Sequence, residues 1–232
     1  MKVFRSRGLF FWVFLALYFS VADYVSAQAY KAEALSEAPP TELSGSVREA
    51  LSPTVIRVSG PGGVLCDIWL RKEVPGTANA PRSLGAVYPQ LAQGTLLAAI
   101  RFPKAVKDYC RQTIKPGVYT LRYLLLPEDG NHMGVAAQRD FVLASPADPD
   151  GDSATTSIEQ TIALSRKATG SKHPSVWSLG PPEDHPQSLP SVFHLQDGDL
   201  WLVEFDLPLQ TGTGDVSMVP MALVVVGSAP QA

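Results

Sequence analysis

The side chains best spaced for chemistry in this sequence are four carboxylates. If residue 148 is counted as position 1 of a loop, positions 1, 3, 5 and 12 hold Asp148, Asp150, Asp152 and Glu159. Calcium-binding loops supply oxygen ligands from the same four positions. The spacing therefore predicts a Ca²⁺ site. The sixth position holds Ser153 instead of the glycine that such loops carry. An acidic turn that caps a following helix is the alternative, because negative charge is favoured at a helix N-terminus.

A second metal hypothesis concerns His132, which stands beside Met133 in the segment 127–134 (PEDGNHMG). A histidine next to a thioether suits copper or another soft metal. Adjacent residues of a strand point to opposite faces, which argues against a shared ion. A long hairpin loop, whose Asn and Asp side chains bond their own backbone, is the alternative interpretation.

Catalytic motifs are missing from the sequence: Gly-x-Ser-x-Gly, Ser-x-x-Lys and His-Glu-x-x-His do not occur. Glu204 and Asp206 share one face of a predicted strand, but alternating acids are also typical of a solvated face. A Ser-His-Asp triad is defined by geometry, so an enzyme stays open as an alternative.

Two tryptophans could form a binding platform instead. Trp69 falls on the strand face shared by Asp67 and Arg71, and Trp177 lies in a predicted loop. Flat aromatic rings with an N–H group can stack on sugars or peptides. The alternative is that both rings pack into the core or at a sheet edge.

Residues 1–29 have the features of a cleaved secretory signal. Lys2, Arg5 and Arg7 precede an apolar run over residues 9–22, and small residues suited to signal peptidase follow. As a helix this run spans about 21 Å, less than the ~30 Å of a hydrocarbon core. An uncleaved membrane anchor is the alternative. We therefore expect export to the periplasm or the extracellular space, and no transmembrane span in the mature chain.

Charge and cysteine content restrict the partners and the compartment further. The 232 residues include 19 Lys and Arg against 22 Asp and Glu, and no basic cluster stands out. Nucleic acid, which needs concentrated positive charge, is therefore not an expected partner. Cys66 and Cys110 are the two cysteines, and an even count in an exported chain predicts one disulfide. Two unbridged thiols, one of them a nucleophile, are the alternative.

Alternation with a period of two dominates the chain and predicts strands. The predicted strands cover residues 54–58, 64–71, 95–102, 117–126, 139–144, 199–207 and 221–226. Residues 157–168 have helical spacing, with Ile158, Ile162 and Leu164 near one face and Gly170 as a stop. The prediction is a mainly β fold: a β-sandwich, Ig-like or jelly-roll-like, with one short helix packed at an edge. Residues 30–46 read as a flexible lead-in and residues 47–232 as a single domain.

Two stretches resemble segments of an uncharacterised group of exported bacterial proteins. They are IKPGVYTLRYLLLPEDGNHMGVAAQRDF (residues 114–141) and LSRKATGSKHPSV (residues 164–176). The similarity covers about residues 47–227 and implies no activity. It draws attention to His132 and His173, one in each stretch, as ligands of one metal if they converge with a carboxylate.

The function expected from these observations is non-catalytic: an exported domain that binds a protein or carbohydrate partner or supports an envelope assembly. No cofactor is expected, with Ca²⁺ at Asp148–Glu159 as the exception that the loop spacing allows. The alternative is a metal-dependent protein or hydrolase that uses the histidines or the acidic loop. Fold alone does not decide between them.

Overall fold

A computed structural model of the chain describes residues 30–77, 85–127, 136–184, 186, 188–212 and 214–229. The predicted signal, residues 1–29, lies outside them. Strands make up 49% and helices 10% of the structure, so the mainly β prediction is confirmed. No helix among the described residues is both long and apolar enough to cross a membrane.

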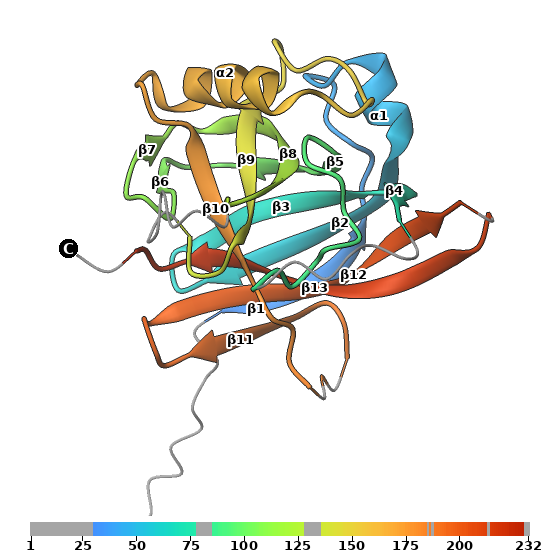
Figure 1. Ribbon diagram of the computed structural model, residues 1–232. Helices are drawn as coiled ribbons and strands as arrows, with labels where there is room; N and C mark the ends of the chain where they lie inside the picture. The colour runs from blue at the N-terminus through green and yellow to red at the C-terminus, as the bar shows by residue number, and fades with distance from the viewer. Residues whose placement is uncertain are drawn as a thin grey trace, which may run out of the picture.

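The described elements follow the order given in Figure 1. The strands are β1 (Lys31–Ser36), β2 (Leu51–Gly60), β3 (Gly63–Arg71), β4 (Val74–Gly76), β5 (Leu96–Phe102), β6 (Val106–Lys107), β7 (Thr113–Ile114), β8 (Gly117–Leu125), β9 (Asp140–Pro146), β10 (Ser175–Gly180), β11 (Ser191–Leu195), β12 (Leu200–Thr211) and β13 (Val216–Val226). The helices are α1 (Gly45–Ala50) and α2 (Ile158–Thr169).

Ten of these strands lie on one hydrogen-bonded path, β1-β2-β3-β5-β8-β9-β10-β13-β12-β11, and β4 adds in parallel to β12. The strand β10 joins the two parts of the path. Its residues 175–178 pair with β9, whereas Leu179 and Gly180 pair with β13. The sheet curls around this strand until β1 contacts β11, the other end of the path (Figure 1). The structure thus shows one continuous curled sheet and does not confirm a sandwich.

The main core fills the inside of the curl. Alternate residues of β8, among them Tyr119, Leu121 and Tyr123, point inward as the alternation predicted. They share one cluster with Ile68 of β3 and Phe205 of β12, so strands far apart on the path pack against the same core. Burial of such side chains from water is the main stabilising contribution to the fold.

Residues 30–46 are not a flexible lead-in. Lys31–Ser36 form β1, which pairs with β2 from Lys31 opposite Ser59 to Ser36 opposite Thr54. The helix α1 follows, capped by the hydroxyl of Ser44, which accepts a hydrogen bond from the backbone N–H of Val47 at 3.2 Å. This segment therefore belongs to the folded domain.

Helix α2 confirms the predicted ends. Ser157 caps its start by accepting from the N–H of Gln160 at 3.1 Å, and Gly170 ends it with φ of +64°, a conformation that glycine adopts readily. The helix lies across β9 and β10, inner strands of the sheet, and not at an edge as predicted (Figure 1).

A network of charges fixes the outer face where β1, β2, β3 and β5 meet. The buried carboxylate of Asp67 accepts hydrogen bonds from Arg57 at 2.7 Å and from Arg101 at 2.8 Å. Glu37, just after β1, accepts from the same two guanidinium groups at 3.1 and 2.6 Å. Burial of Asp67 acts to raise the pKa of its carboxyl, but the bonds from Arg57 and Arg101 outweigh it and the pKa lies below its usual value.

We expect Asp67→Asn to lower the free energy of unfolding at pH 7 by about 1–3 kcal/mol, since hydrogen bonds to a charged group are lost. A carboxyl with a depressed pKa stabilises the fold above its unfolded pKa of about 3.9, and this contribution is lost as the pH falls through the folded pKa. The difference between wild type and variant should therefore shrink below about pH 4 in urea titrations. Glu42→Gln, on an exposed carboxylate, is the control; a deficit for Asp67→Asn that does not change with pH would contradict the assignment.

Candidate functional site

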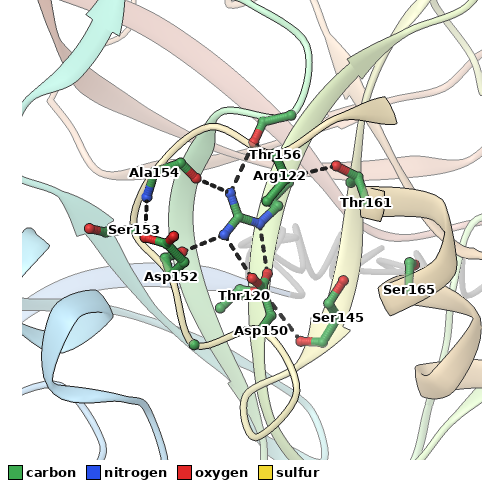
Figure 2. A network of polar contacts seen from close by, with 12 residues as sticks. Thr120, Arg122, Ser145, Asp150, Asp152, Ser153, Ala154, Thr156, Thr161 and Ser165 are labelled. Carbon is green, nitrogen blue, oxygen red and sulfur yellow. Dashed lines mark hydrogen bonds and ion pairs between the residues drawn. The ribbon is translucent and has the colours of Figure 1, made fainter. Parts of the chain in front are cut away.

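The acidic loop predicted to bind calcium surrounds a buried arginine instead (Figure 2). Arg122 of β8 is fully buried. Its Nε and one Nη donate to the two carboxylate oxygens of Asp150, both at 2.7 Å. The other guanidinium N–H groups donate to the backbone oxygens of Gly94, Asp152 and Ala154 at 3.0, 2.5 and 2.8 Å. All five N–H donors of the guanidinium are thus satisfied.

The four carboxylates of the calcium hypothesis are not brought together. Both oxygens of Asp150 are committed to Arg122, while the side chains of Asp148, Asp152 and Glu159 are exposed. One Asp152 oxygen accepts from the backbone N–H of the residue two positions on, at 2.9 Å, as in a turn. Among the described residues, no group of three or more His, Cys, Asp or Glu is close enough to hold a metal. The segment instead leads directly into the cap of α2.

The Arg122–Asp150 pair predicts a large effect on stability. Arg122→Met leaves a buried carboxylate without its cation, which should cost about 3–5 kcal/mol of unfolding free energy in a urea titration. The double variant Arg122→Met/Asp150→Leu should recover most of this loss, because apolar replacement of a whole buried pair is often neutral. Arg48→Met, on the exposed face of α1, is the control. An Arg122→Met variant as stable as this control would refute the role of the pair.

The two histidines of the second metal hypothesis have different outcomes. His132 lies outside the described residues. His173 is exposed in the connection between α2 and β10, and its backbone oxygen accepts from the hydroxyls of Thr169 and Ser171 at 2.7 and 3.1 Å. The convergence of His132 with His173 therefore stays a prediction.

The tryptophan platform is wrong, because both rings are buried: Trp69 is 0% and Trp177 2% exposed. The indole N–H of Trp69 donates to the backbone oxygen of Glu37 at 2.9 Å, and the Arg101 guanidinium lies 4.9 Å from its ring centre. Trp177 lies in β10 and not in a loop, and it stacks on Phe102 with ring centres 4.9 Å apart. Both side chains hold the core together.

The predicted disulfide is also corrected, since Cys66 and Cys110 are both thiols. Cys66, on β3, points into the main core. Cys110 packs against a separate apolar cluster on the outer face of β8, β9 and β10, so the sheet itself separates the two sulfurs. Burial raises the pKa of both thiols, that of Cys110 to about 11.

Thiol chemistry can test this placement. Protein denatured without reductant should take up two equivalents of maleimide, one on each cysteine. In the native state Cys110 should react slowly at pH 7 and faster as the pH rises toward about 11, because the thiolate is the reactive form. Cys66 should react only on unfolding. Denatured, unreduced protein without a reactive thiol would show a disulfide and contradict the structure.

A cavity of about 420 Å³ with the shape of a ligand pocket lies between α2 and the outer face of the sheet. Its floor is formed by Leu124 of β8, Phe141 and Leu143 of β9, and Val176 of β10, which belong to one buried apolar cluster. Ile162 of α2 packs against the same cluster and forms part of the wall. The lining is mostly hydrocarbon.

The cavity exists because α2 contacts the sheet through small side chains. Its buried face carries Thr161, Ser165 and Ala168, and not the predicted isoleucines. The hydroxyl of Ser165 donates to the Ala144 oxygen of β9 at 2.8 Å and accepts from the Ser175 N–H of β10 at 2.9 Å. These short contacts bind the helix to both strands.

Both isoleucines of α2 line the cavity. Ile158, Ile162 and Arg166 follow one another at intervals of four, which places them along one line of the helix. All three line the cavity, and Ile158 remains 39% exposed at its mouth.

The mouth of the cavity is basic. Arg166 of α2 and Lys172 and His173 of the following connection line it, and each of these residues is exposed. Gln112 lies beside them, but its amide is occupied by Asp108 and by the Pro174 oxygen, at 3.0 and 2.7 Å. Among the described lining residues, none carries a carboxylate.

Burial also affects groups that could take part in catalysis. Cys110 lies on the cavity wall, and its raised pKa keeps it protonated at neutral pH. A thiol without a lowered pKa is a weak nucleophile. Glu204, which could have served a catalytic pair, is buried on β12, where burial raises its pKa and the N–H of Glu183 donates to it at 3.2 Å.

Comparison with known proteins adds no relative: no family model matches the chain, and neither the curated proteins nor the solved structures contain a match.

Proposed function

We propose that this chain is an exported, non-catalytic binding protein that holds an apolar small molecule in the cavity beneath α2. The observation that carries the proposal is that one set of α2 residues contacts the sheet and another set lines the cavity. The small residues Thr161, Ser165 and Ala168 are buried against the sheet, while Ile162 is only partly buried against the outer apolar cluster and lines the cavity together with Ile158. A helix that served only to cover the sheet would bury both isoleucines fully against it.

The size and lining of the cavity support a small ligand. Its volume of about 420 Å³ falls within the range of ~300–1,000 Å³ that is usual for small-molecule sites. A hydrocarbon surface fits the apolar lining, whereas a sugar would leave most of its hydroxyls without partners there. The carbohydrate partner expected from the tryptophans therefore gives way to an apolar ligand in this proposal, and a protein partner remains a separate hypothesis.

The curled sheet suits such a role as a rigid support. Within the proposal, its two halves act as the layers of the predicted sandwich, since β3 and β12 contribute to one core. The cavity floor then consists of the outer face of β8, β9 and β10, strands whose inner face is fixed by that core. A preorganised floor lowers the cost of ligand binding.

The proposal predicts that the neutral dye N-phenyl-1-naphthylamine binds the mature protein with a rise in fluorescence, as it does in apolar surroundings. Ile162→Gln should weaken binding about tenfold, since about 1.4 kcal/mol of apolar contact corresponds to that factor. Ala163→Gln places the same side chain on the neighbouring, exposed position of α2 and should leave binding unchanged. Thermal melting of both variants checks the fold; absence of dye binding, or equal loss in both variants, would overturn the proposal.

A further inference from the structure

The basic mouth of the cavity calls for a ligand of particular charge. Three arginines that are buried or half-buried have acidic partners: Arg57 and Arg101 bind Asp67, and Arg122 binds Asp150. A fourth, Arg71, donates to the backbone oxygen of Ser153. Arg166 and Lys172 have no ion pair with a described residue, although both border an apolar cavity. Two cations that form no ion pair within the described part of the chain, at the mouth of a hydrocarbon-lined site, are complementary to an anion.

The helix end alone does not account for this placement. Arg166 and Lys167 both lie in the last turn of α2, where basic residues are favoured by the negative end of the helix dipole. Only Arg166 of the two lines the cavity, because it continues the line of Ile158 and Ile162. Lys172 lies beyond Gly170, where the helix has ended, and it still borders the mouth. Position relative to the cavity, and not position in the helix, is what these two cations share.

A carboxylate that is hydrogen-bonded to the lining residue Gln112 does not neutralise the mouth. Asp108 is fully buried below it, and its oxygens accept from the Gln112 backbone and amide N–H groups at 2.7 and 3.0 Å and from the Val176 N–H at 3.1 Å. This carboxylate is thus saturated by groups of the loop and of β10. The side chains of Arg166 and Lys172 remain available to a ligand.

We propose that the ligand of this cavity is an amphipathic carboxylate of the fatty-acid class, with its alkyl chain on Leu124, Leu143 and Ile162 and its head group between Arg166 and Lys172. The inference rests on the proposed function and adds the chemistry of the head group. A carboxylate at the edge of an apolar cavity is less screened than in bulk water, so its attraction to two cations is stronger there. The guanidinium of Arg166 can also donate to both carboxylate oxygens at once.

The test compares three ten-carbon probes that differ only in head group: decanoate, decanol and decylammonium. Each displaces N-phenyl-1-naphthylamine from the mature protein at pH 7, below its micelle-forming concentration. Decanoate should bind about tenfold more tightly than decanol, and decylammonium more weakly than decanol. The preference for decanoate should shrink as salt is added, because partly exposed charges are screened.

Variants assign the preference to the two cations. Arg166→Gln and Lys172→Gln should each weaken decanoate several-fold, and together bring it to the affinity of decanol, while decanol binding stays unchanged. Lys167→Gln removes the same charge from the same helix turn without touching the cavity and should change neither probe. Equal binding of all three probes, or equal losses in Lys167→Gln and Arg166→Gln, would overturn the head-group inference and leave the cavity function standing. Absence of binding by dye and probes alike would overturn both.

Discussion

The fully desolvated pair of Arg122 and Asp150 is the interaction on which the outer layer of this protein depends. A buried guanidinium is tolerated only when its charge and every N–H find a partner. Here the partners come from the loop before β5 and from residues 150–154, which have no regular structure of their own. The arginine therefore acts as a template that gives this connection one conformation. Ser157, the cap of α2, follows three residues after its last contact, so the same pair sets where the helix begins.

The position of α2 in turn decides the character of the site. The hydroxyl of Ser165 bonds to strands β9 and β10 together, which holds the helix close to the sheet along one line. Thr161 and Ala168 lie on the same line of the helix and are also small. The helix therefore packs closely on the sheet along this line, and its larger side chains lie beside the contact. The cavity is the space left between that narrow contact and the apolar outer cluster around Leu143. A polar contact thus creates an apolar site.

Local signals in the sequence were sufficient to predict the ends of the helix α2 and the positions of the long strands. The ends of α2 follow from Ser157 and Gly170, and the long strands follow from alternation. Six strands were missed: β1, β4, β6, β7, β10 and β11. The two longest of them, β1 and β10, were missed for opposite reasons. The side chains of β1 are mostly small or exposed, so its pairing with β2 is set by the partner, whereas β10 is buried throughout and shows no alternation. Tertiary context overrides such weak local preferences.

Alternation also tells which residues share a face, but not what covers that face. Trp69 does lie opposite the main core, as its spacing indicated, and so does Arg122. Helix α1 and the acidic loop nevertheless bury the two side chains. The same limit applies to the site. The line Ile158, Ile162 and Arg166 is visible in the sequence, but its choice of cavity over core depends on the hydrogen bonds of Ser165. The number of cysteines likewise predicts a disulfide without showing that the sheet lies between the two sulfurs.

Because β10 pairs with β9 along one part of its length and with β13 along the other, it affects how the molecule unfolds. One six-residue strand, buried along its whole length, carries the backbone bonds between the two parts of the sheet and also provides Val176 to the cavity floor. Strands on either side of it pack into one interior, so neither part can be released without exposing the apolar surface of the other. The two parts are therefore a single cooperative unit. A chain cut before β10 would yield fragments that depend on each other for solubility, and the cavity would be lost with the first step of their separation.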